Sequence, residues 1–264
     1  MKEQSAANAS HNRAARERLE YMTDFDAAPV DAIVSPFYDR DGITIYNADC
    51  RDVLPMLGKF DLLLTDPPYE LDAPAFDLME PLCESMYCFG DIEVIAERWF
   101  RACGMANKRL LVWYYKNSPK PRGRWRQAMQ GIIYGYNDDA PFDQDAVRVE
   151  YTEGAKKLNG RTRPSAGRLA TAEKYDTSKG ALPRSVIECP ALLGHRSRER
   201  VGHRDQKPLE LIDRLIRSAK AGSVIDPYMG SGTTLVACQR LGVPCIGIEV
   251  ERKWCEAAVR RLAR

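Results

Sequence analysis

Short apolar runs of strand length alternate with segments of helical periodicity near the start of the chain. Residues 43–46 (Ile-Thr-Ile-Tyr) predict a strand, because they follow the turn signal Asp41-Gly42. Residues 52–57 have the spacing of a short helix that Gly58 ends, and the apolar run at 61–65 follows directly. A strand, a helix and a strand so close together form a βαβ unit, which predicts a parallel sheet.

The same alternation recurs later in the chain. An apolar run at 86–89, a helical period at 92–103 and a strand-like run at 110–115 follow one another. Beyond Pro208 the pattern predicts an amphipathic helix from 209, a strand at 224–225, a helix at 233–241, a strand at 243–248 and a helix at 253–264. This order predicts an α/β fold with a Rossmann-like, doubly wound and mostly parallel sheet.

Two regions depart from this pattern. Residues 1–35 predict an N-terminal extension, partly disordered, with room for a helix at 14–21, so that the folded domain spans 36–264. Residues 116–200 are rich in proline and glycine and predict an insert, in which 130–136 and 186–187 are candidate strands of the core sheet. The polar residues around 156–179 lack the apolar side chains that a core of their own requires.

Composition and charge restrict the class of protein. The 264 residues contain no apolar run of membrane-spanning length, and the polar residues 1–12 do not form a secretory signal. The eight cysteines form no CxxC pair and no metal-ligand spacing with histidine, which predicts reduced thiols, no metal site and a cytoplasmic protein. Net charge is +2, but residues 156–207 hold 13 Lys/Arg against 5 Asp/Glu, so this segment is expected to face a polyanion rather than only solvent.

The first group of candidate ligand-binding residues lies at a strand-to-helix turn near the C-terminal end. In 230–233 (Gly-Ser-Gly-Thr), glycines allow a ligand to approach backbone amides at a helix start. Glu249, 23 residues after Asp226 and at the end of the next strand, is placed to bind both hydroxyls of a ribose. Because no third glycine follows, a pyrophosphate cofactor and an NAD-type oxidoreductase are disfavoured. An acid at the strand tip, Asp226, suits an ammonium or sulfonium group and so S-adenosylmethionine.

A second polar strand tip follows the apolar run at 61–65. In Thr65-Asp66-Pro67-Pro68-Tyr69 the prolines fix φ and donate no N–H, so the backbone leaves the sheet with free carbonyls. A carboxylate, a carbonyl and an aromatic face within four residues can hold a flat ring that carries an amino group. The alternative is a strand that simply ends in a proline turn.

Together these stretches resemble the DNA amino-methyltransferases that modify adenine N6 or cytosine N4. The resemblance rests on residues 65–69, on His203 with 206–208 (Gln-Lys-Pro), and on 226–234 (Asp-Pro-Tyr-Met-Gly-Ser-Gly-Thr-Thr). The order, with the catalytic tetrapeptide first and the cofactor loop last, resembles the circularly permuted beta group. It covers roughly residues 40–115 and 200–264, and departs from the family at Tyr228, usually Phe, and after His203, where Pro-Thr is common.

The resemblance implies a mechanism and a set of site residues. The implied catalytic residues, which accept the two amine protons and stack on a flipped base, are Asp66, Pro67, Pro68 and Tyr69. The implied cofactor-binding residues are Asp49, Cys50, Asp66, Lys207, Asp226, Pro227, Tyr228, Gly230, Ser231, Gly232, Thr233, Thr234 and Glu249. Among these, Asp49 would accept from the adenine amino group unless it only caps a helix, and Lys207 would lie near the cofactor carboxylate unless it points to solvent.

The implied activity is methyl transfer from S-adenosylmethionine to adenine N6 in a specific double-stranded DNA sequence, leaving S-adenosylhomocysteine. Cytosine N4 methylation is the near alternative. In the cytosine N4 enzymes Ser is commoner than Asp before Pro-Pro-Tyr, so Asp66 favours adenine, but only modestly. An inactive DNA-binding protein and an RNA substrate are more distant alternatives. A homodimer and an accompanying restriction enzyme are left open.

The insert is the expected target-recognition region, with arginines for phosphates or base edges. These candidates are Arg122, Arg124, Arg126, Arg161, Arg163 and Arg168. Other conspicuous residues are expected to be structural: Trp113 in the core or pocket wall, Cys245 inside a strand rather than a nucleophile, and His195 and His203 in contact with backbone or DNA. Asp91 is a weak candidate at the end of a strand.

Overall fold

The computed structural model describes residues 35–117, 125–151, 153–156, 160, 178–192 and 199–264. The predicted helix at 14–21 and the arginines at 122, 124, 161, 163 and 168 lie outside these residues. Residues 36–264 form one compact unit.

Nine strands of the described chain form one sheet in the order β1-β2-β9-β8-β3-β4-β6-β5-β7. The strands are β1 (Tyr38–Arg40), β2 (Ile43–Tyr46), β3 (Phe60–Thr65), β4 (Cys83–Gly90), β5 (Asn107–Tyr114), β6 (Met129–Tyr136), β7 (Val186–Glu188), β8 (Val224–Asp226) and β9 (Cys245–Ile248). The run β2-β9-β8-β3-β4 is parallel throughout. The prediction of a mostly parallel α/β sheet is therefore confirmed.

The two candidate strands of the insert do return to the core sheet. β6 pairs antiparallel with both β4 and β5, and β7 pairs parallel with β5. Their apolar residues explain this placement, because Ile132, Ile133 and Ile187 are each buried in the core. Residues 116–200 as a target-recognition region stay a prediction.

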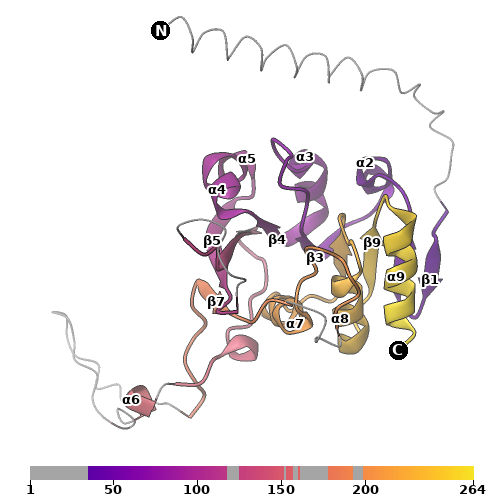
Figure 1. Ribbon diagram of the computed structural model, residues 1–264. Coiled ribbons are helices and arrows are strands. Elements are labelled where there is room, and N and C mark those ends of the chain that lie inside the picture. Colours follow the sequence, from indigo (N-terminus) through magenta and orange to yellow (C-terminus); the bar gives the residue numbers. More distant parts are fainter. Residues whose placement is uncertain (1–34, 118–124, 152, 157–159, 161–177, 193–198) are drawn as a thin grey trace, which may run out of the picture. The chain divides into compact units, whose positions relative to one another are not determined.

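Helices cover both faces of the sheet in Figure 1, with α2, α3, α4 and α5 on one face and α7 and α8 on the other. The helical segments are α2 (Cys50–Val53), η1 (Leu54–Met56), α3 (Phe76–Met79), η2 (Glu80–Leu82), α4 (Ile92–Val94), η3 (Ile95–Trp99), α5 (Phe100–Ala102), η4 (Asp145–Val147), α6 (Glu153–Lys156), α7 (Leu209–Ser218), α8 (Thr233–Leu241) and α9 (Arg252–Leu262). None of the described helices has the length and apolar character needed to cross a bilayer.

The helix predicted for 92–103 is present but irregular. Its middle, η3, is a π-helical turn between α4 and α5. The turn carries Trp99, whose indole N–H donates to the Leu71 carbonyl at 3.1 Å and whose ring meets Tyr69 edge-on, with 6.3 Å between centroids. Apolar periodicity could not reveal this turn, because a π turn shifts the helical phase by one residue.

The centre of the sheet explains why the functional tips are rigid. Leu62, Leu63 and Leu64 of β3 are each at most 2% exposed, so β3 is buried on both of its faces. β3 lies between β8 and β4, with Leu63 opposite both Ile225 and Met86. Since parallel neighbours end at the same edge of a sheet, the residues that follow β3 and β8 meet there.

Candidate active site

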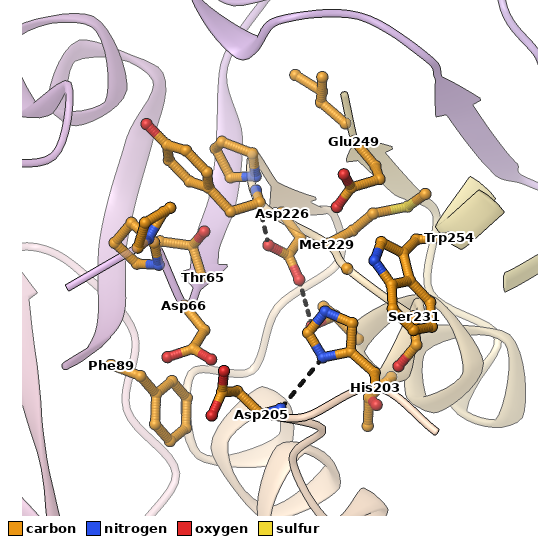
Figure 2. Close-up of a pocket in the computed structure, with 18 of the residues that line it drawn as sticks. Thr65, Asp66, Phe89, His203, Asp205, Asp226, Met229, Ser231, Glu249 and Trp254 are labelled. Atoms are coloured by element: carbon orange, nitrogen blue, oxygen red, sulfur yellow. Dashed lines mark hydrogen bonds between the residues drawn. The ribbon is translucent and has the colours of Figure 1, made fainter. Parts of the chain in front are cut away.

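A cleft of about 420 Å³ lies at the edge where the parallel strands end. It is lined by the residues that follow β2, β3, β8 and β9, and Figure 2 shows Asp66, Asp226 and Glu249 among its side chains. In an open parallel sheet this edge is where ligands bind. Polar groups gather at this edge because each of these strands is an apolar run that is followed by an acid or a glycine turn.

All four residues predicted as catalytic line this cleft, and so do all of those predicted for the cofactor except Gly232. Gly232 is turned toward α9: its φ is +76°, and a Cβ there would lie 2.6 Å from the Cβ of Ala258. A side chain at this position is excluded by both the conformation and the packing. Gly232 therefore shapes the loop, and the roles of the other residues toward a ligand stay predictions.

Both carboxylate oxygens of Asp66 are engaged by the chain. The Tyr69 hydroxyl donates to Oδ1 at 2.9 Å, and the Lys207 ammonium donates to Oδ2. Gln130 Nε2 in turn donates to the Tyr69 hydroxyl at 3.1 Å. Burial raises the pKa of the Tyr69 phenol, and the neighbouring Asp66 charge adds to this shift. Tyr69 is therefore a neutral hydrogen-bond donor to Asp66 at neutral pH.

Lys207 lies in the cleft wall and not in solvent, because it is 6% exposed. Its ammonium also donates to the Asp205 carbonyl at 3.1 Å and lies 5.2 Å from the centre of the Phe89 ring. The solvent-exposed alternative for this lysine is excluded. Its expected approach to a cofactor carboxylate stays a prediction, and the contact that the sequence did not reveal is the ion pair with Asp66.

The loop after β8 is held by its own polar groups. Asp226 is 4% exposed, its Oδ2 accepts from the Thr234 hydroxyl at 2.6 Å, and its Oδ1 accepts from the Tyr228 N–H at 3.2 Å. Burial raises the pKa of Asp226 to about 7. The expected contact of Asp226 with a cationic group stays a prediction, while the structure gives this carboxyl a role within the loop.

Helix α9 packs against the outer side of the same loop, which the sequence did not predict. Arg261 is 7% exposed and its Nη1 donates to the Ser231 carbonyl at 2.8 Å, to the Ser231 hydroxyl at 3.3 Å and to the Thr233 hydroxyl at 3.0 Å. Burial lowers the pKa of Arg261 to about 10, so the guanidinium stays charged at neutral pH. Trp254 of α9 lies edge-on against His203, 4.5 Å between centroids (Figure 2).

Asp49 and Glu249 lie at the ends of β2 and β9. Asp49 caps α2 by accepting from the Arg51 N–H at 2.9 Å, and its hydrogen bonds to the Arg51 side chain lower its pKa. Glu249 Oε1 accepts from the Glu251 N–H at 2.7 Å, and burial raises its pKa. Asp49 is thus a helix cap that also lines the cleft, and its contact with an adenine stays a prediction.

The remaining residues singled out in the sequence fall into two groups. Trp113 and Cys245 are buried in the core, as expected, and His203 accepts from the Asp205 N–H at 3.3 Å, a backbone contact. Asp91 caps α4 and accepts from Gln127 Nε2 at 3.2 Å. Arg126 is exposed, whereas His195 lies outside the described residues. No cluster of three His, Cys, Asp or Glu that would hold a metal occurs among the residues described.

Comparison with known proteins identifies the family. The family model described as DNA methylase, of the N6/N4 methyltransferase type, matches residues 82–260, which is most of the folded unit. The chain belongs to this DNA methylase family. It is therefore a DNA methyltransferase of the N6/N4 type, as the strand-tip motifs predicted.

Individual relatives agree with this assignment. Type II methyltransferase M.ScaI of Streptomyces caespitosus is 24% identical over 88% of this chain and 84% of its own length. DNA adenine methyltransferase YhdJ of Escherichia coli K12 is 27% identical over 85% of this chain and 84% of its own.

Solved structures share the fold of this DNA methylase. The M1.HpyAVI-SAM complex superposes with a TM-score of 0.57 at 24% identity, over 83% of this chain and 99% of that one. The cytosine-N4-specific PvuII DNA methyltransferase gives 0.54 at 15% identity, over 83% and 86% of the two chains. At these identities the likeness concerns the fold alone.

Proposed function

We propose that this DNA methylase transfers a methyl group from S-adenosylmethionine to the N6 amine of adenine within a specific sequence of double-stranded DNA. The observation that carries the proposal is the position of Asp66 at the cleft, between the Tyr69 hydroxyl and the Lys207 ammonium. A carboxylate held in this way is a fixed acceptor for an amino group. The name of YhdJ, an adenine methyltransferase, supports the choice of base.

The residues of the cleft fit S-adenosylmethionine, which supplies a methyl group on a sulfonium. The positive φ of Gly230, +49°, and of Gly232, +76°, keeps the loop after β8 close to the start of α8 without a side chain in the way. The Glu249 carboxyl lines the cleft at the end of β9, where a carboxylate can bind ribose hydroxyls, and the Glu251 N–H helps to hold it there. Asp49 and Cys50 would border the adenine. The solved M1.HpyAVI-SAM complex has the same fold.

The chain's own groups address the low nucleophilicity of the target amine, whose lone pair is delocalised into the ring. We assign Asp66 Oδ1 and the Pro67 carbonyl as hydrogen-bond acceptors for the two amine N–H groups, which localises the lone pair on nitrogen. The nitrogen takes the methyl group as the sulfonium C–S bond breaks, and it then loses one proton, which Asp66 can accept and pass to solvent. Because Oδ1 accepts from Tyr69 here, the amine replaces the tyrosine hydroxyl as donor. That frees the Tyr69 ring to stack on a base flipped out of the duplex, while Lys207 keeps Oδ2 in place.

Nucleoside analysis of DNA treated with the protein and S-adenosylmethionine tests the choice of base. We expect N6-methyladenine. N4-methylcytosine without N6-methyladenine would replace the proposal with cytosine N4 methylation, which is the specificity named for the PvuII enzyme of the same fold. Failure to transfer labelled methyl to any DNA would favour an inactive DNA-binding protein instead.

A further inference from the structure

The hairpin that joins β5 to β6 carries the most exposed large apolar side chain among the residues described. Trp125 is 92% exposed, whereas Val250, the next in order, is 67% exposed and Phe142 is 40% exposed. Leaving an indole in water forgoes the stabilisation that burying its large apolar surface gives. An exposed aromatic ring is a surface on which a nucleic-acid base can stack, so Trp125 is a candidate for contact with DNA.

The root of this hairpin is fixed to the catalytic edge. The Tyr115 N–H donates to the Ala128 carbonyl at 2.9 Å, which closes the base of the hairpin. Gln130 bonds the Tyr69 hydroxyl at 3.1 Å, and Gln127 bonds Asp91 at 3.2 Å. Trp125 is five residues from Gln130, and five extended residues span at most about 18 Å. The exposed indole therefore lies within reach of whatever base Tyr69 contacts.

The neighbouring charge matches a DNA partner. Arg126 follows Trp125 directly and is exposed. An arginine beside an exposed aromatic ring combines phosphate attraction with stacking, which is how single bases and unstacked steps are held. Among the described residues, the other exposed aromatic side chain is Phe142, which follows the far end of β6, away from the catalytic edge.

We propose that Trp125 is a wedge that stacks in the duplex at the place which the target base leaves when it flips into the cleft. This inference rests on the proposed function. Flipping costs the stacking and pairing of one base, and an apolar side chain inserted at the same step offsets part of that cost. The indole has a flat face large enough to stack on the neighbouring bases. Trp125 is thus a positioning residue and takes no part in the methyl transfer itself.

Methyl transfer to a paired and to an unpaired target base distinguishes a wedge from a residue with only a structural role. The target sequence is first found by modification mapping of DNA treated with the wild-type protein. Two duplexes with that site are then prepared, one fully paired and one with an abasic analogue opposite the target base. The variants are Trp125→Ala and Trp125→Phe, with Phe142→Ala as the matched exposed aromatic control.

We expect Trp125→Ala to lower kcat/KM at least about tenfold on the paired duplex and less than about threefold on the abasic one, where the target is already unpaired. The kcat/KM of Trp125→Phe on the paired duplex should lie between those of the wild type and Trp125→Ala. Phe142→Ala should change kcat/KM by the same factor on both duplexes. An equal loss on the two duplexes, or no loss on either, would overturn the wedge. Absence of methyl transfer by the wild type would show itself at the mapping step, as failure of the proposed function.

Fluorescence gives a second readout that needs no turnover. The other three tryptophans are Trp99, Trp113 and Trp254, of which the first two are buried. Stacking of Trp125 between bases should quench wild-type emission on DNA binding, and the Trp125→Phe variant should lose most of that quenching. Equal quenching in both proteins would contradict insertion.

Discussion

The loop after β8 and the described ends of the hairpin between β5 and β6 lie at the same edge of the sheet, where Gln130 bonds Tyr69, but they are built in opposite ways. In the loop, Asp226, Ser231 and Thr233 are each at most 6% exposed and their polar groups are bonded within the chain. In the described part of the hairpin, Trp125 and Arg126 are exposed, while Gln127 and Gln130 near its root are bonded to Asp91 and Tyr69. The polar groups of the loop are bonded before any ligand binds, whereas Trp125 and Arg126 of the hairpin are exposed to solvent.

This difference follows from the two proposed ligands. A small donor molecule has one shape, so a loop preorganised for it loses little conformational entropy on binding. DNA is long and deformable, and its phosphates and bases can supply the partners that the hairpin lacks. Changes in the loop should therefore affect donor binding, and changes in the hairpin should affect DNA handling.

Asp66 belongs to neither region, and its replacement should have the largest effect. Asp66→Asn keeps an oxygen for Lys207 but accepts amine protons poorly, so we expect kcat to fall by about 10²-fold to 10⁴-fold. Binding of S-adenosylmethionine, measured by calorimetry, and binding of DNA should both stay close to the wild type. Asp66→Ala is expected to abolish transfer too, but it also leaves the buried Lys207 unpaired. Near-normal turnover of Asp66→Asn would refute the catalytic assignment.

Removal of the hydrogen bonds that α9 donates to the loop after β8 should weaken donor binding and leave DNA binding unchanged. Arg261→Gln loses hydrogen bonds to Ser231 and Thr233, each worth about 1.5–3 kcal/mol for a charged donor, so we expect the Kd for S-adenosylmethionine to rise at least about tenfold. The exposed Arg260 of the same helix provides the matched control Arg260→Gln. An unchanged Kd in the folded Arg261→Gln protein would mean that the loop holds its shape without α9.

Charge removal in the insert should affect DNA binding alone. Neutralising Arg161, Arg163 and Arg168 together should weaken DNA binding and make its dependence on salt shallower, by about 0.9 in log–log slope for each phosphate that these arginines no longer neutralise. Titration of DNA at several salt concentrations measures the slope. An unchanged slope would show that this stretch does not face phosphates, and donor binding serves as the internal control.

The smallest expected effect concerns the pH dependence of stability. The pKa of Asp226 is raised to about 7 in the fold, above the value of about 3.9 for an unfolded chain. The stabilisation linked to its proton is complete below the unfolded pKa and is lost as pH rises through 7. Asp226→Asn should remove this part of the pH dependence. Denaturant unfolding of both proteins from pH 5 to pH 8 tests this, and parallel curves would contradict the shift.

The parts of the site that the sequence predicted are those that are local in the chain. An apolar run followed by Asp-Pro-Pro-Tyr, or by an acid and a glycine turn, encodes both a buried strand and its polar tip within ten residues or so. The ion pair of Lys207 with Asp66 joins residues far apart in sequence, on either side of the insert, and no local pattern specifies it.

Arg261 left a weaker signal that could have been used. It falls on the apolar face of α9, with Cys255, Ala258 and Leu262, where an arginine needs a buried acceptor. The chain around it is rich in arginine and lysine, so charge alone did not distinguish it from Arg260. The helical phase does distinguish them, which shows that a charged residue in an apolar stripe should be assigned a partner when a site is predicted.

The eight cysteines, all buried and unpaired, have a practical consequence. Burial raises the pKa of the thiols of Cys50, Cys83, Cys88 and Cys103, which keeps the reactive thiolate scarce. A cysteine introduced at an exposed position, such as Met129→Cys at the root of the hairpin, would therefore react with a maleimide dye far faster than the native thiols. The wild-type protein then serves as the unlabelled control, so a dye at this position can report DNA binding near the hairpin without prior removal of any cysteine.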